Sequence, residues 1–172
     1  MKNFVMGLCV LTLFIGCGYK PSAQYARDIL GQKIYPQISI TRLDPKNSVI
    51  VKDAISEAII TRFHGKLSAQ EDADSMLHVS FGSVSFKPIV YDQNGYIIAY
   101  KATVNLSISY SDKNKKTGTL STSGEFDFPI TANSVISDNL RFEAIKSASL
   151  DAINEFISAI TIKGMQNGKH NQ

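Results

Sequence analysis

The chain has 172 residues, and its 18 Lys and Arg against 15 Asp and Glu give a formal net charge of +3. This length suits a single domain with a buried core. The charge balance is far from that of nucleic-acid-binding proteins, so it argues against that class.

Residues 1–16 have the organisation of a secretory signal. Lys2 supplies a positive charge, an apolar run follows at Phe4–Ile15, and Gly16 is a small residue at the break. The apolar run is shorter than the roughly 20 residues that a transmembrane helix needs. We therefore predict that Met1–Gly16 is removed as a signal peptide.

The end of this signal, residues 13–17 (LFIGC), resembles the lipobox of bacterial lipoproteins. The resemblance implies cleavage before Cys17 and attachment of lipid to that residue. In such lipoproteins an Asp after the cysteine retains the protein at the inner membrane, so Gly18 favours the outer membrane. Cys9 leaves with the signal, so no disulfide can form within the mature chain. The alternative is a secreted protein in which Cys17 keeps a free thiol, which is an uncommon arrangement.

Residues 17–32 are predicted to form a lipidated tether, because the segment after the cysteine is polar and carries Pro21 and Gly31. Lys33–Leu43 alternates apolar and polar residues, which predicts a strand with one buried face.

Asp44–Ser48 has the composition of a turn that leads into a helix, and the helix is predicted to run to about His64. Its apolar stripe consists of Val51, Ile55, Ala58, Ile59 and Phe63. Lys66–Ser75 is predicted to be a polar loop. The acidic run at 71–74 suggests a cation site, but nothing else there supplies ligands, so a solvated loop is favoured.

Met76–Tyr91 is predicted to be a long strand in which the apolar alternation changes step at Gly82-Ser83, which indicates a bulge. Asn94-Gly95 supplies the residues that a tight hairpin turn needs. Tyr96–Tyr110 is the clearest strand, with strict alternation over about 15 residues. Most strands have only about 5–6 residues, so we expect this hairpin to project.

Ser111–Gly118 is a predicted loop with three lysines, and Thr119–Pro129 is the next strand. The short connections on both sides of Tyr96–Tyr110 predict an antiparallel meander of three strands.

A second long helix is predicted to begin at Asp138 or Asn139 and to continue to about Thr161, with Gly164 ending it. Residues 165–172 are polar and basic, and they are predicted to form a disordered tail.

These elements predict an α+β fold for residues 33–164, a two-layer sandwich with two helices packed on one face of a four-stranded mixed sheet. A right-handed crossover between the first two strands places the first helix on one face of the sheet. Whether Lys33–Leu43 pairs with the second strand or with the last one stays open.

No catalytic arrangement stands out, so we predict a protein without enzymatic activity, cofactor or metal. His64, His78 and His170 are too far apart to have the spacing of metal ligands. The chain has neither a Gly-x-Ser-x-Gly elbow nor a phosphate-binding glycine loop.

The element order is similar to that of the LptE family of lipopolysaccharide-assembly lipoproteins. Besides the lipobox, the matches are Cys17-Gly18-Tyr19, Asp44-Pro45, Asn94-Gly95 with Tyr100 beyond it, and Phe126-Asp127-Phe128. The resemblance covers essentially all of the mature chain. It implies two helices on a four-stranded sheet and a role as a plug inside a large outer-membrane β-barrel, LptD. Together the two proteins place lipopolysaccharide in the outer leaflet, and the family member itself binds lipopolysaccharide.

Lipopolysaccharide presents phosphates and carboxylates, which Lys and Arg side chains can bind. The candidate ligand-binding residues are Lys87 and Lys101 on the long hairpin and Lys113, Lys115 and Lys116 on the following loop. The alternative is that they are ordinary solvated lysines. The hairpin turn of the family tends to carry a basic residue, whereas this turn reads Asp92-Gln93-Asn94-Gly95.

Tyr91, Tyr96 and Tyr100 are candidates for a contact with the barrel, although the alternation directs Tyr96 and Tyr100 toward the core. A function from another class also fits a lipid-anchored, non-catalytic module. The chain would then be an adaptor, such as a pilotin or a transport auxiliary, of a different envelope complex.

Overall fold

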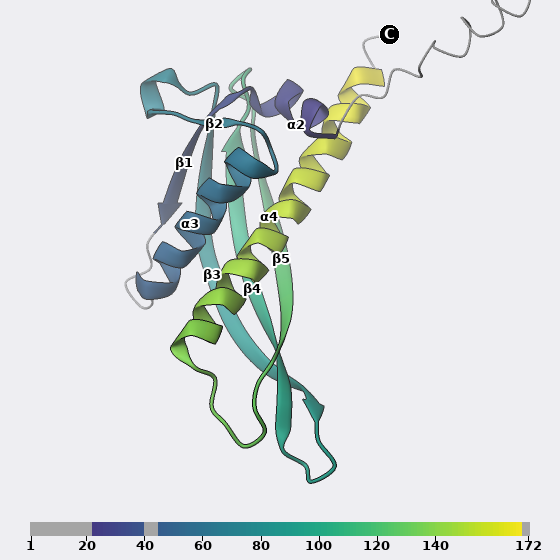
Figure 1. The fold of residues 1–172 in the computed structure, drawn as a ribbon. Helices are drawn as coiled ribbons and strands as arrows, with labels where there is room; N and C mark the ends of the chain where they lie inside the picture. The colour runs from purple at the N-terminus through teal and green to yellow at the C-terminus, as the bar shows by residue number, and fades with distance from the viewer. Residues whose placement is uncertain (1–21, 40–44, 170–172) are drawn as a thin grey trace, which may run out of the picture.

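The computed structural model describes residues 22–39 and 45–169. In these residues three α-helices, one short 3-10 helix and five strands form (Figure 1). In chain order they are α2 (Ser22–Leu30), β1 (Lys33–Ser39), α3 (Pro45–Thr61), β2 (Lys66–Leu67), η1 (Gln70–Asp72), β3 (Ser75–Tyr91), β4 (Ile97–Ser111), β5 (Thr117–Pro129) and α4 (Asp138–Lys169). None of the helices in these two ranges combines the length and the apolar character that crossing a bilayer requires.

The strands form one mixed sheet in the order β2-β1-β3-β4-β5. β1 is parallel to β2 and β3, whereas β3, β4 and β5 form the predicted antiparallel meander. The sheet has one strand more than predicted, because Lys66–Leu67 pairs with Lys33–Ile34 where a loop was expected. Two residues are too few to show an alternation. The partner that the sequence left open for β1 is β3, and residues 40–43 of the predicted strand lie outside the described residues.

The pairing of β3 with β4 changes register between Phe81 and Ser83, which confirms the predicted bulge. A Cβ atom on Gly82 would lie 3.1 Å from the carbonyl oxygen of Asn105, so glycine allows the two strands to approach at this point. Further shifts occur over residues 88–91, near the end of the hairpin. Bulges bend a strand and increase its twist, so the hairpin does not continue the plane of the sheet.

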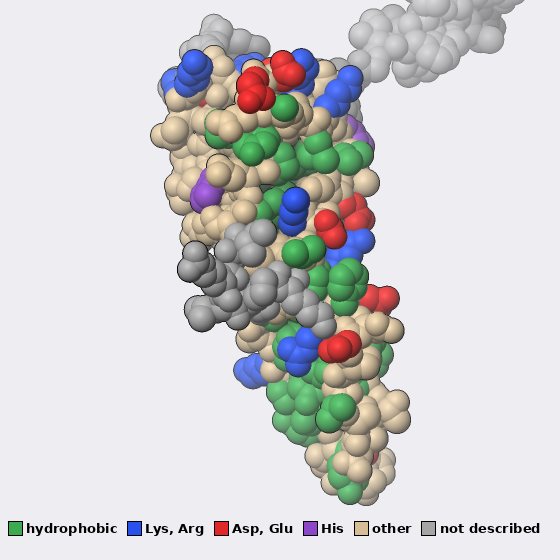
Figure 2. Space-filling model, turned by 90° about the vertical axis from the view of Figure 1, so that its left-hand side faces the viewer, with side chains coloured by type: hydrophobic (Ala, Val, Ile, Leu, Met, Phe, Trp, Pro, Cys, Tyr) green, Lys and Arg blue, Asp and Glu red, His purple; other side chains and the backbone are tan. Residues whose placement is uncertain are grey.

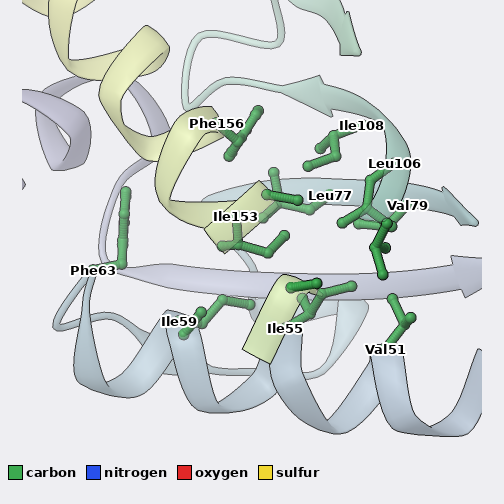
Figure 3. Close-up of a cluster of buried hydrophobic side chains, with 14 of the residues drawn as sticks. Val51, Ile55, Ile59, Phe63, Leu77, Val79, Leu106, Ile108, Ile153 and Phe156 are labelled. Atoms are coloured by element: carbon green, nitrogen blue, oxygen red, sulfur yellow. The ribbon is translucent and has the colours of Figure 1, made fainter. Parts of the chain in front are cut away.

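α3 and α4 pack on the same face of the sheet, as predicted, and the opposite face has no helix from the described residues on it (Figure 1). Apolar side chains from both helices and from β3 and β4 form one core (Figure 3). The labelled members are Val51, Ile55, Ile59, Phe63, Leu77, Val79, Leu106, Ile108, Ile153 and Phe156. Burial of one such side chain contributes roughly 1.5–3 kcal/mol, so this layer is the main source of stability.

α4 lies close against β5 at Gly124, where a Cβ atom would come within 1.9 Å of a backbone oxygen of the helix. The same helix covers the outer edge of β5. The carboxylates of Glu155 and Asp151 accept hydrogen bonds from the backbone N–H groups of Ser123 and Glu125, at 2.8 and 3.0 Å. Occupied N–H groups protect an edge strand from pairing with another chain.

The predicted tether contains a helix, α2, that belongs to the folded domain. Ala26, Ile29 and Leu30 are 0%, 8% and 1% exposed, because α2 packs against α4. The two helices approach closely at Gly164, where a Cβ atom would lie 2.6 Å from the backbone oxygen of Tyr25. The folded part therefore begins before β1. A helix of nine residues is marginal by itself and depends on this packing, which local sequence does not reveal.

α4 begins at Asp138, one of the two predicted start residues, but it does not end at Gly164 and continues to Lys169. The glycine permits the close approach of α2 and is not a C-terminal cap. Residues 165–169 of the predicted disordered tail are therefore helical, and residues 170–172 lie outside the described residues.

Candidate functional site

The open face of the sheet carries mainly hydroxyl and amide side chains, as the alternation of the strands predicted. They are Ser83 and Ser85 on β3, Thr103, Asn105, Ser107 and Ser109 on β4, and Thr119, Ser121 and Ser123 on β5. Hydrogen bonds join neighbouring strands across this face. The Nδ2 group of Asn105 donates to Oγ of Ser83 at 3.0 Å, and the hydroxyl oxygens of Ser109 and Thr119 are 3.0 Å apart.

Beside the bulge this part of the sheet is hollowed into an open depression of about 380 Å³. The residues around it are mostly polar by type and include Asn105, Ser107, Ser121, Ser123 and Glu155, although apolar atoms make up more of its surface than polar atoms. Small-molecule sites are mostly apolar and enclose their ligand. This depression is wide open and does not enclose a ligand, so its shape suits contact with the surface of another macromolecule better.

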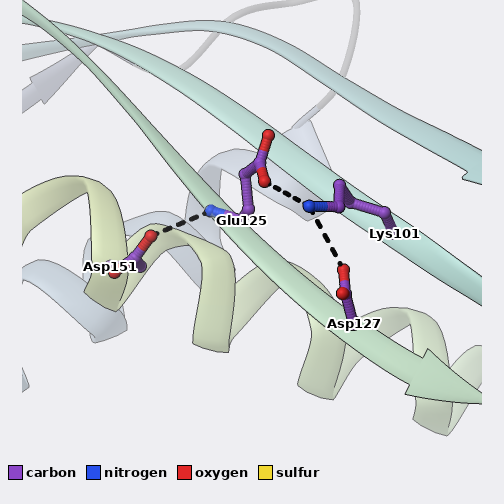
Figure 4. A network of polar contacts seen from close by, with 4 residues as sticks. All are labelled: Lys101, Glu125, Asp127 and Asp151. Atoms are coloured by element: carbon purple, nitrogen blue, oxygen red, sulfur yellow. Dashed lines mark hydrogen bonds and ion pairs between the residues drawn. The ribbon is translucent and has the colours of Figure 1, made fainter.

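Lys101 lies on the open face near the projecting part of the hairpin, directly opposite Lys87 on β3. Its ammonium group forms an ion pair with Glu125 and lies 3.6 Å from the carboxylate of Asp127 (Figure 4). The hydrogen bond to Glu125 is the main cause that raises the pKa of Lys101, and the charge of Asp127 adds to it. These groups are solvent-exposed, so the ion pairs add little stability, but they offset the charge of Lys101.

The other three candidate lysines, Lys113, Lys115 and Lys116, are exposed on the turn between β4 and β5. The Oδ1 atom of Asp112 accepts hydrogen bonds from the backbone N–H groups of Asn114 and Lys116, each at 2.8 Å. This turn is joined to α2, because the N–H of Lys113 donates to a backbone oxygen of that helix at 3.1 Å.

The structure does not bring the five lysines together. Lys101 and Ser111 are ten residues apart on one extended strand, which corresponds to roughly 34 Å at about 3.4 Å per residue. Lys87 and Lys101 lie toward the β3–β4 turn, and the three lysines of the β4–β5 turn lie at the opposite end, beside α2 (Figure 1). A single phosphate group cannot contact both sets.

The apolar end of the hairpin consists of Ile89, Val90, Tyr91 and Tyr96, of which sequence reasoning named the two tyrosines but missed Ile89 and Val90. The exposed fractions of these side chains, in chain order, are 37%, 43%, 57% and 48%. This end extends past α3 and α4, so no helix covers it (Figure 1). In Figure 2 the lower tip carries apolar and uncharged side chains, whereas charged side chains of both signs gather at the upper end. The run of four apolar residues 88–91 next to a turn was the available signal.

Tyr96 therefore does not face the core, contrary to the alternation, because the core does not reach this far along the hairpin. Tyr100 is half-buried as predicted, and its ring stacks on that of Phe128 with centroids 6.2 Å apart.

The sequence profile of the LptE lipopolysaccharide-assembly family matches residues 35–160, which is well over half of the chain. The chain belongs to the LptE family. This is a family of non-enzymatic lipoproteins that act in lipopolysaccharide assembly. A comparison with curated protein sequences finds no match.

Several solved structures are similar to this chain at low identity. A protein from Xanthomonas campestris has 12% identity and a TM-score of 0.50, over 80% of this chain and 87% of that one. Rare lipoprotein B from Shewanella oneidensis has 10% identity and a TM-score of 0.40, over 81% and 95%. Lipoprotein B from Nitrosomonas europaea has 12% identity and a TM-score of 0.46, over 79% and 88%.

In this LptE-family chain the acidic run after β2 has a structural role at the α2 end. The Oδ2 atom of Asp74 accepts hydrogen bonds from the backbone N–H groups of Gln32 and Lys33, at 2.7 and 2.8 Å. These two N–H groups hold the pKa of Asp74 below its ordinary value of about 3.8. Within residues 22–39 and 45–169, no three His, Cys, Asp or Glu side chains come together as metal ligands would.

The predicted signal peptide and the lipid-bearing Cys17 lie outside the described residues. Their assignment stays a prediction from the sequence.

Proposed function

We propose that the chain is an outer-membrane lipoprotein, acylated at Cys17, that occupies the lumen of an LptD-type β-barrel and assists in assembling lipopolysaccharide. Membership of the LptE family supports the role in lipopolysaccharide assembly. The acyl chains keep the protein at the membrane, since each buried CH₂ contributes about 0.8 kcal/mol.

The long sheet with one polar face is the observation that best supports insertion into a barrel. β3 has 17 residues, which corresponds to roughly 56 Å at about 3.3 Å per residue. The apolar band of an outer-membrane barrel is only about 25 Å tall, and its interior is polar. A sheet of this length reaches from one rim of a barrel to the other, and its hydroxyl-lined face matches a polar lumen.

We assign the lipopolysaccharide contact to the projecting part of the hairpin. Lys87 and Lys101 lie opposite each other close to the apolar hairpin end, so phosphates and acyl chains can be bound by neighbouring groups. Because Glu125 and Asp127 offset the charge of Lys101, Lys87 is expected to contribute more to phosphate binding.

Affinity purification from detergent-solubilised outer membranes tests the barrel contact. We expect a large β-barrel protein to be recovered with the acylated chain, and recovery of the chain alone would contradict the proposal. A photo-crosslinking residue at Thr103, on the open face, should capture the barrel. The same residue at Lys52, exposed on α3, is the matched control and should capture less.

The apolar hairpin end is tested with Tyr91→Ser and Tyr96→Ser. Both side chains are exposed, so the free energy of unfolding should change by less than about 0.5 kcal/mol. The amount of lipopolysaccharide that co-purifies with the protein should fall, whereas Gln93→Ser in the same turn should leave it unchanged. Equal recovery with all three variants would exclude this end from the contact.

Depletion of the protein separates this function from the adaptor function. Defective surface lipopolysaccharide is the expected result. Normal lipopolysaccharide with a lost secretion or transport trait would instead assign the chain to another envelope complex.

A further inference from the structure

We propose that the end of the domain formed by α2 and the β4–β5 turn lies against the membrane that anchors the chain. In this arrangement Lys113, Lys115 and Lys116 contact the headgroups of anionic phospholipids. The proposal rests on the acylation of Cys17 in the proposed function and goes beyond it, because it sets the orientation of the domain and names a second lipid contact.

The first support is the rigid attachment of α2. Ala26 and Leu30 are 0% and 1% exposed, and the helix meets α4 at Gly164 with no room for a side chain between the backbones. α2 is thus part of the folded domain, and its position relative to the sheet does not vary as that of a flexible tether would.

The connection from α2 into β1 is also held in place. Gly31 adopts a positive φ of 78°, and its N–H donates to the backbone oxygen of Arg27 at 2.8 Å. Asp74 then binds the next two backbone N–H groups, those of Gln32 and Lys33. No loose segment separates the helix from the sheet.

The remaining link to the membrane is short. Only residues 18–21 stand between Cys17 and Ser22, the first residue of α2. An extended chain advances at most about 3.6 Å per residue, so Ser22 lies within roughly 18 Å of Cys17. The α2 end of the domain must therefore remain close to the leaflet that holds the acyl chains.

The β4–β5 turn is fixed to this same end. The N–H of Lys113 donates to the backbone oxygen of Ile29 at 3.1 Å, which joins the turn to the last residues of α2. The carboxylate of Asp112 accepts two backbone N–H groups inside the turn, so the turn holds one shape. The three lysine side chains extend from this shaped turn into solvent.

The α2 end also carries acidic side chains. Asp74 and Asp112 bind backbone N–H groups, whereas Glu71 and Asp72 are exposed on η1. The other charged groups on the elements around it are Arg27, Asp28, Lys33, Lys66 and Lys163. With both signs present, attraction to an anionic surface is moderate. Several acyl chains already hold the protein at the membrane, so the role of the lysines is to orient the domain against the leaflet.

The test uses the acylated full-length protein in lipid vesicles, with one added cysteine that carries a fluorophore. Cys9 is lost with the signal and Cys17 is acylated, so the added thiol is unique. Asn114→Cys places the probe in the lysine-bearing turn, and Asn94→Cys places it at the equivalent position of the β3–β4 turn. The vesicles contain phosphatidylglycerol and a lipid with a headgroup-attached quencher.

We expect the probe at residue 114 to be quenched and the probe at residue 94 to remain bright. Equal quenching at both positions, or quenching only at residue 94, would overturn the proposal. Intact mass spectrometry of each sample checks the acylation, and a bare thiol at Cys17 would remove the premise.

The role of charge is tested by combining Lys113→Gln, Lys115→Gln and Lys116→Gln with the probe at residue 114. Each lysine near an anionic membrane strengthens binding by roughly fivefold. Quenching by phosphatidylglycerol vesicles should therefore fall to the level found with zwitterionic vesicles, while Lys52→Gln, an exposed lysine on α3, should have no effect. Circular dichroism confirms that each variant folds. Unchanged quenching in the triple variant would refute the lipid contact.

Vesicles with lipopolysaccharide in place of phosphatidylglycerol form the last arm. Stronger quenching at residue 114 with these vesicles would assign the lysines to lipopolysaccharide phosphates instead. A negative result for this membrane contact can be told apart from a negative result for the barrel contact. The vesicle experiments contain no barrel protein, and the co-purification does not depend on the three lysines.

Discussion

The β3–β4 and β4–β5 turns share one backbone arrangement but present opposite chemistry. In each turn, Oδ1 of an aspartate accepts hydrogen bonds from the backbone N–H groups two and four residues later. Asp92 accepts from Asn94 and Tyr96, and Asp112 accepts from Asn114 and Lys116. The first turn is surrounded by exposed apolar residues, and the second carries lysines and contacts α2. The same local motif therefore serves two different surfaces at opposite ends of the sheet.

This difference indicates that the aspartate motif determines only the shape of the turn. The use of each turn depends on what lies next to it. One turn extends beyond the helices, and the other is held against α2. The following variants test this comparison, from the largest expected effect to the smallest.

Gly164→Val should have the largest effect, because its side chain would occupy the space taken by the backbone of Tyr25. Displacing α2 exposes Ile29 and Leu30, so the free energy of unfolding should fall by about 3 kcal/mol. Urea denaturation measures the loss. Hydrogen exchange should become faster in α2 and in the β4–β5 turn but not in the β3–β4 turn, and uniform acceleration would contradict a local role.

Asp112→Ala should destabilise the protein more than Asp92→Ala. Each change leaves two turn N–H groups without their acceptor, at a cost of about 1–2 kcal/mol. Only the change at Asp112 also loosens the contact with α2. Denaturation of both variants under the same conditions measures the difference, and equal losses would show that the contact with α2 adds nothing.

Gly95 and Lys115 occupy the fourth position of their turns, counted from Asp92 and Asp112. Placing each residue in the other turn should change the free energy of unfolding in opposite directions. Gly95 has φ of 83° and Lys115 has φ of 60°, a region that glycine adopts more easily than other residues. Lys115→Gly should stabilise and Gly95→Lys should destabilise the protein, each by about 1 kcal/mol. Thermal denaturation gives both values, and shifts of the same sign would contradict this explanation.

The smallest expected effect is on the pH dependence of stability, to which Asp74 at the α2 end contributes. The pKa of Asp74 is lower in the folded chain than its ordinary value of about 3.8, so the folded state favours the ionised form. Its contribution to stability is present above pH 4 and is lost as the pH falls through the folded pKa. Asp74→Asn keeps an acceptor oxygen without this titration, so stability measured from pH 7 to pH 2 should fall less steeply in the variant.

The sequence alone determined the features that depend on neighbouring residues. Strict alternation gave the long strands and the polar open face, Asn94-Gly95 gave the hairpin turn, and the break in alternation at Gly82 gave the bulge. Helical spacing likewise gave α3 and most of α4. The order of these elements carried the similarity to the LptE family, which the profile over residues 35–160 confirms.

Only the tertiary structure decided the features that depend on distant contacts. α2 is stable because it packs on α4, and Gly164 lies within a helix because α2 crosses there. β2 exists because β1 lies beside it. The five lysines form two separate groups because a strand extends about 3.4 Å per residue. The alternation in the sequence shows which residues share a face of the strand, but it does not show how far apart they lie along it.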